Sequence, residues 1–119
     1  MLKAASFALA VLVAAPVLAH PKLVTSVPAA NATVAAPALV SMSFNERIVP
    51  RFSGATVTMV PPAGAAQPVT GLATSFGADG KSILLKGPHA LKAGSYKVAW
   101  HAVATDTHRV AGSFMFKVR

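Results

Sequence analysis

The stretch Tyr96-Lys97-Val98-Ala99-Trp100-His101-Ala102-Val103 decides the fold class of this chain. Its large or apolar side chains recur at every second position from Tyr96 to Ala102, which is the period of a β-strand with one buried face. Helical periodicity is absent from residue 20 onwards. Further strand candidates cover residues 40–45, 55–60, 82–86 and 114–118, and weaker ones cover 22–27 and 72–76. The chain is therefore predicted to be all-β.

Turn signals between these segments predict how the strands are arranged. Asp79-Gly80, just before residues 82–86, is a hairpin signal, and Pro61-Pro62-Ala63-Gly64 is typical of a loop. The segment 91–96 resembles a tyrosine corner, in which the hydroxyl of Tyr96 bonds back to upstream backbone. We therefore predict a small antiparallel Greek-key β-sandwich of about seven strands, Ig-like or cupredoxin-like.

The composition excludes several classes of function. With 119 residues the chain has room for one small domain. The lack of cysteine excludes disulfides, thiolate metal sites and cysteine nucleophiles. Only Glu46, Asp79 and Asp106 are acidic, which is too few for a calcium or magnesium cage or a paired-carboxylate hydrolase. The 11 Lys and Arg residues are dispersed, so the net charge of +8 does not predict nucleic-acid binding.

Residues 1–19 have the three parts of a secretory signal peptide. A short positive start is followed by an apolar run and then by small residues before His20. We expect cleavage between Ala19 and His20, which leaves residues 20–119 as one exported, periplasmic domain. The alternative is a retained membrane anchor, but residues 4–19 are shorter than the ~20 residues that a spanning helix needs.

Cleavage at this point would give the mature chain an amino-terminal histidine. The α-amine and Nδ1 of His20 can then close a chelate ring on one metal ion. Pro21 has no backbone N–H, so the neighbouring peptide nitrogen cannot lose a proton and become a ligand. The amine and the imidazole are therefore the expected donor pair, and both must be deprotonated to bind.

A second candidate element is Asp106-Thr107-His108. If this segment is extended, the side chains of Asp106 and His108 point to the same face. Together with His20 they supply three nitrogens and one oxygen, and a tetragonal set of this kind suits Cu(II). An isolated Asp-x-His is common by chance, so the prediction depends on its pairing with the amino-terminal histidine.

With these residues in view, the chain resembles the CopC copper-resistance family of periplasmic copper-binding proteins. The resemblance covers essentially all of residues 20–119. It is carried by His20 and by the segments LVTSVP (23–28), NATV (31–34), SFNE (43–46), FSGA (52–55), LKAGSYKVAW (91–100) and TDTHRVAGSF (105–114).

The resemblance implies a small β-sandwich that holds one Cu(II) through His20, Asp106 and His108, with Glu46 as a partner that orients the site. It implies a binding protein, not an enzyme, which sequesters or delivers copper outside the cytoplasm. A CopD-type inner-membrane copper transporter is the implied protein partner. We expect a monomer that binds no DNA or other nucleic acid. The family usually has glycine where this chain has Thr107, a change that leaves both ligands in place.

Some family members carry a methionine-rich loop with a second, Cu(I) site. The mature chain has only Met42, Met59 and Met115, none of them in an M-x-x-M arrangement. The strand period also places Met42 among the buried positions. The resemblance therefore implies a member that binds Cu(II) only.

Two further histidines are weaker candidates for ligands. His101 is expected on the exposed face of its strand, and His89 follows Pro88 in a loop. Trp100 is expected in the core, so it offers no aromatic platform for a substrate.

Two other functions stay open at this point. A copper mono-oxygenase would also use an amino-terminal histidine clamp, but it needs an open coordination position and a substrate-binding face. A metal-free structural sandwich would leave His20, Asp106 and His108 far apart in the fold.

Overall fold

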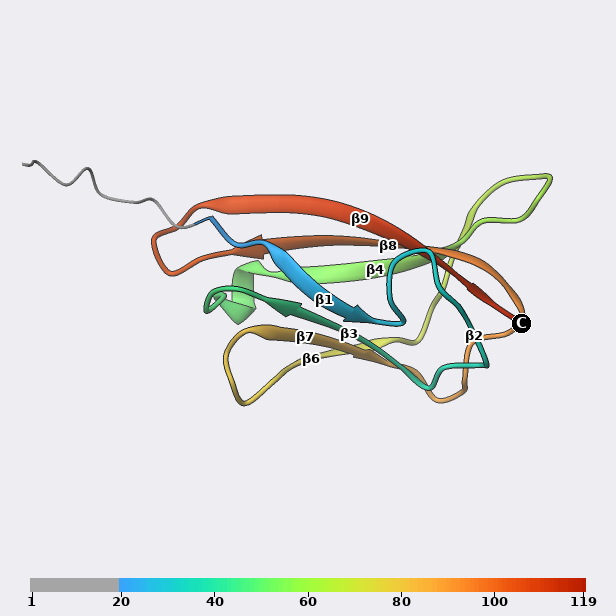
Figure 1. The fold of residues 1–119 in the computed structure, drawn as a ribbon, viewed down its shortest axis with the longest axis horizontal. Coiled ribbons are helices and arrows are strands. Elements are labelled where there is room, and N and C mark those ends of the chain that lie inside the picture. The colour runs from blue at the N-terminus through green and yellow to red at the C-terminus, as the bar shows by residue number, and fades with distance from the viewer. Residues whose placement is uncertain (1–19) are drawn as a thin grey trace, which may run out of the picture.

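Two β-sheets packed face to face form the part of the chain that the computed structural model describes, residues 20–119 (Figure 1). The first, sheet A, is antiparallel throughout and has the strand order β1-β3-β7-β6. Its strands are β1 (Leu23–Val27), β3 (Leu39–Phe44), β7 (Ser82–Lys86) and β6 (Ala73–Phe76).

The second sheet, sheet B, has the order β2-β9-β8-β4-β5. Its strands are β2 (Thr33–Val34), β9 (Arg109–Val118), β8 (Gly94–Val103), β4 (Gly54–Met59) and β5 (Gln67–Pro68). The long hairpin of β8 and β9 forms its centre and is paired over the full length of both strands. A short 3-10 helix, η1 (Pro50–Phe52), leads into β4.

The core lies between the sheets and follows the alternation of the sequence. The strand residues of the core cluster are Val40, Met42, Phe44, Val57, Ile83, Leu85, Tyr96, Val98, Trp100, Ala102, Phe114, Phe116 and Val118. Across the interface, Phe44 meets Trp100 edge to face, with ring centroids 5.1 Å apart. Gly112 in β9 leaves the space that the indole occupies, since a Cβ there would lie 2.5 Å from a Trp100 ring atom.

The structure confirms the predicted fold class and every predicted strand. It also confirms the tyrosine corner, because the hydroxyl of Tyr96 donates a hydrogen bond of 2.6 Å to the carbonyl of Lys92. The predicted hairpin at Asp79-Gly80 joins β6 to β7, with Gly80 in the left-handed region at a φ of 72°.

Two details of the prediction are corrected. The two-residue strands β2 and β5 were not expected, because a period of two cannot be recognised in so few residues. In addition, β2 pairs parallel with β9, so sheet B is mixed and not fully antiparallel. The physical reason is that β2 only covers the edge of the sheet, where the N–H groups of Lys117 and Arg119 bond the carbonyls of Ala32 and Val34.

Four segments meet at one end of the sandwich, on the left in Figure 1. They are residues 20–22, the loop 45–49, the β6–β7 turn 77–81 and the β8–β9 turn 104–108, and we call this the site end. Backbone contacts tie them together. The N–H of Ile48 bonds the carbonyl of Gly80 at 2.9 Å, and Ile48 also forms an isolated β-bridge with Ala104.

No helix within residues 20–119 is both long enough and apolar enough to cross a bilayer. The predicted signal peptide, residues 1–19, lies outside the described residues.

Candidate metal centre

The β8–β9 turn places Asp106 and His108 next to each other. The segment is not extended, because the chain reverses direction here between two strands of the same hairpin. The reversal is closed by hydrogen bonds from Ala104 N–H to the His108 carbonyl and from Thr107 N–H to the Ala104 carbonyl, both 2.9 Å. Thr107 adopts a φ of 74°, the left-handed region that glycine occupies most easily.

Asp106 accepts two hydrogen bonds from His108 within this turn. One oxygen accepts from the backbone N–H at 3.1 Å, and the other lies 3.0 Å from Nδ1 of the ring. These bonds, the backbone one first, lower the pKa of the Asp106 carboxyl, and the nearby charges of His108 and His20 add to the effect. The carboxylate is therefore ionised, Nδ1 of His108 faces it, and Nε2 is the ring nitrogen left for another partner.

His20 approaches the same turn from the other end of the chain. Its ring stands almost perpendicular to that of His108, with centroids 5.0 Å apart and an interplanar angle of 81°. Pro21 beside it is fully buried, whereas His20 itself is exposed. The structure thus brings His20, Asp106 and His108 together. The alternative of a metal-free structural sandwich predicted that they would lie far apart.

The three side chains do not yet enclose a common point. Within residues 20–119, no three His, Asp or Glu side chains converge as a metal site in this arrangement. Both oxygens of Asp106 are engaged by His108 itself. In the full-length chain the nitrogen of His20 is also an amide joined to Ala19, so the α-amine donor exists only after cleavage.

The acidic residues of the chain gather at the site end. All three acidic residues of the chain, Glu46, Asp79 and Asp106, belong to its loops and turns. Five cations with no acidic neighbour in sequence lie toward the other end, namely Lys86, Lys92, Lys97, Lys117 and Arg119. The same segments also contain Lys22, Arg47 and Lys81, so the carboxylates of the site end are balanced by three cations.

Glu46 lies in the loop after β3 and is half-buried. Its neighbour Asn45 bonds the backbone of Lys22, and Ile48 bridges to Ala104, so the loop passes between the amino-terminal segment and the β8–β9 turn. The salt bridge found among residues 20–119 joins Asp106 and His108. Glu46 thus belongs to a loop of the site end, and its carboxylate forms no salt bridge among residues 20–119.

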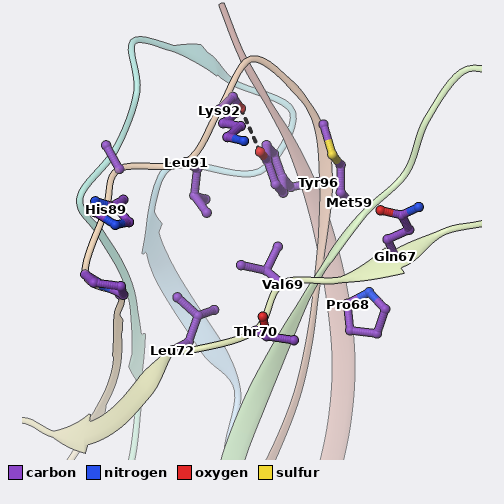
Figure 2. A pocket seen from close by; sticks show the side chains of 13 residues that line it. Met59, Gln67, Pro68, Val69, Thr70, Leu72, His89, Leu91, Lys92 and Tyr96 are labelled. Atoms are coloured by element: carbon purple, nitrogen blue, oxygen red, sulfur yellow. Dashed lines mark hydrogen bonds between the residues drawn. The ribbon is translucent and has the colours of Figure 1, made fainter.

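The other candidate ligands lie elsewhere. His101 stands on the outer face of sheet B over Gly54, where a Cβ would come within 3.3 Å of its ring. His89 lines a pocket of about 380 Å³ at the opposite end of the sandwich, and Met59 lies in the facing wall (Figure 2). Met42 is buried as predicted, and Met115 is exposed, so these methionines do not form a cluster.

Sequence reasoning missed the structural part that two residues play at the site end. Pro21 was considered only for its missing N–H, yet its ring is among the most fully buried side chains. Asn45 was noted only as part of the SFNE segment, yet its side chain bonds the backbone of Lys22 at 2.7 Å. No pattern in a single sequence could have shown the Asn45 contact, because the two residues are 23 positions apart.

Comparison with known proteins gives one consistent result. The CopC domain model matches residues 23–119. A copper resistance protein C from Xanthomonas campestris pv. juglandis is 43% identical over 110 residues, which cover 91% of this chain and 87% of that protein. Another, from Pseudomonas syringae pv. tomato, is 43% identical over 115 residues, 95% of this chain and 91% of that protein.

A solved structure agrees with this result. The crystal structure of PcoC, described as a methionine-rich copper resistance protein from Escherichia coli, matches with a TM-score of 0.79 at 40% identity and covers 85% of this chain and 100% of that one. These relatives are copper resistance proteins, in line with the prediction of a binding protein and not an enzyme. The chain belongs to the CopC domain family of copper resistance proteins.

Proposed function

We propose that this protein is exported to the periplasm and binds one Cu(II) ion, which it sequesters or delivers in copper resistance. The observation that carries the proposal is the edge-to-face approach of His20 and His108, 5.0 Å between ring centroids, from opposite ends of the chain. Two imidazoles this close, beside an ionised carboxylate, are a donor set that suits Cu(II) and contains no soft sulfur ligand.

The proposed ligands are the amine and Nδ1 of His20, one oxygen of Asp106 and the imidazole of His108. Because Nδ1 of His108 faces Asp106, we assign Nε2 as the nitrogen that binds copper. Binding then requires one Asp106 oxygen to leave its hydrogen bond within the turn. Protons compete for the amine and both imidazoles, so the affinity should fall as the pH drops below about 6.

Glu46 is proposed to orient the site without binding the metal. Its half-buried position in the loop between the Lys22 backbone and Ala104 supports this role. Replacing Glu46 by Gln should weaken Cu(II) binding by roughly 10- to 100-fold, as loss of an orienting partner does at other metal sites. An unchanged dissociation constant would rule the role out.

The decisive experiment compares two forms of the protein with one equivalent of Cu(II) by electron paramagnetic resonance. The first form begins at His20, and the second carries one extra glycine before it. The extra residue turns the amine donor into an amide and moves the free amine away from Nδ1, so the nitrogen hyperfine pattern should change and the affinity should fall. Identical spectra and affinities would refute the proposed chelate.

The partner and the location also belong to this proposal. The chain is expected to act as a monomer and to exchange copper with a CopD-type inner-membrane transporter. Sequencing the amino terminus of the protein recovered from the periplasmic fraction tests both the location and the cleavage site. A first residue other than His20 would contradict the ligand set.

A further inference from the structure

Asn45 fixes the backbone directly behind His20. Its side-chain oxygen accepts a hydrogen bond of 2.7 Å from the backbone N–H of Lys22. Its own backbone N–H donates a bond of 3.1 Å to the carbonyl of Lys22. The pair extends the β1–β3 ladder one step beyond the last paired residues, Leu23 and Phe44. In this extra step a side-chain oxygen takes the place that a main-chain carbonyl would have.

Burial of Pro21 holds the same segment in a second way. Its ring is less than 2% exposed, while His20 and Lys22 on either side are exposed. The chain is therefore held at two consecutive residues, by burial at Pro21 and by two hydrogen bonds at Lys22. A chain end is usually mobile unless it is tied down in this way.

We infer that Asn45 is a positioning residue for copper binding: its bond to Lys22 holds His20 beside His108. The inference rests on the proposed function. The physical reason is that a fixed amino terminus loses less conformational freedom when its two nitrogens close on a metal ion. Asn45 is itself exposed and bonds only backbone, so it acts through the position of His20 and not as a ligand.

The test uses the mature protein and three substitutions of Asn45. Asn45→Leu has nearly the same size but no acceptor, and Asn45→Ala removes the acceptor without adding a bulky apolar group. Both should weaken Cu(II) binding by about three- to tenfold, the equivalent of one exposed hydrogen bond. Asn45→Asp keeps the oxygen and should bind at least as tightly as the wild type. Thr25→Val, on the same strand pair, controls for loss of a surface polar group.

A second readout is independent of copper. In the metal-free protein, Asn45→Leu should speed hydrogen exchange of the Lys22 amide by about three- to tenfold, and Asn45→Asp should restore it. The midpoint of urea unfolding should stay the same, because the residue is exposed. A purely structural role would instead lower that midpoint and speed exchange throughout β1 and β3.

Two results would overturn the inference in different ways. If the wild type binds Cu(II) and Asn45→Leu binds it equally tightly, Asn45 does not position the site, even if the Lys22 amide exchanges faster. If the wild type does not bind one Cu(II), the proposed function fails and the inference fails with it. The wild-type titration alone distinguishes the two cases.

Discussion

Asp106 bonds His108 through both of its carboxylate oxygens, one to the backbone N–H and one to the ring. These bonds hold the His108 imidazole in place without a metal ion. Ligating histidines commonly have a carboxylate on the nitrogen that does not bind the metal. Under the proposed function, the Asp106 carboxylate would have to give up one of these hydrogen bonds in order to bind copper.

Replacement of Asp106 by Ala should weaken Cu(II) binding by about 10- to 100-fold, because it removes a charged ligand and frees the His108 ring at once. A competition titration with a chelator of known affinity measures the change. Asp79→Ala is the matched control, since it removes the same charge from the same end of the sandwich. Equal affinities for the two variants would show that Asp106 acts only through its charge.

Replacement of Pro21 by Ala should open a second mode of copper binding. The new peptide N–H can deprotonate and become a ligand, so the visible absorption should move to shorter wavelength above about pH 8 with release of one more proton. Near pH 6.5 the wild-type and variant spectra should coincide, which serves as an internal control. A variant whose spectra follow the wild type across this range would contradict the blocking role of Pro21.

Replacement of Thr107 by Gly should stabilise the metal-free protein by about 1 kcal/mol or less. A β-branched residue at a φ of 74° is strained, and glycine relieves that strain while adding entropy to the unfolded chain. Urea unfolding measures the difference. Thr107→Ala keeps a Cβ and should gain much less, so a Gly variant no more stable than the Ala variant would count against strain at this position.

Asp79 should make the stability of the fold depend on acid pH. The backbone N–H of Lys81 and the hydroxyl of Ser82 both donate to its carboxylate and lower its pKa in the folded state. With a lowered folded pKa, the stabilisation is complete above the ordinary value near pH 4 and is lost as the pH falls through the folded one.

Urea unfolding of the wild type and Asp79→Asn at pH 6 and at pH 2.5 tests this expectation. The variant keeps an acceptor oxygen for the Lys81 N–H but cannot ionise. The wild type should be the more stable protein at pH 6, and the difference should shrink at pH 2.5. A difference that is the same at both pH values would mean that ionisation of Asp79 contributes nothing to folding.

The strands were predictable because each long one has a face that must be buried. Trp100 and Phe44 stand at inward positions of their period, and the structure pairs them across the core. The tyrosine corner was predictable for a similar reason, since the hydroxyl of Tyr96 needs a partner only four residues away. Such features depend on neighbours along the chain.

The site was only partly predictable. The residue types at 20, 106 and 108 indicated where to look, but the sequence did not decide whether Asp106 and His108 lie in a strand or, as in the structure, in a turn. The hydrogen bond between Asn45 and Lys22 depends on how β3 ends beside β1. The alternation of side chains within one strand gives no information about that pairing. Contacts between residues far apart in the sequence become visible only in the folded structure.

The burial of Pro21 separates folding from copper capture. Since Pro21 is fully buried and His20 is exposed, we expect the sandwich to assemble whether or not a residue precedes the histidine. A precursor with its leader still attached would then be a folded protein that lacks one of the four donors. Under the proposed function, cleavage after Ala19 would create the missing amine donor. The precursor would therefore bind little copper in the compartment where it is synthesised.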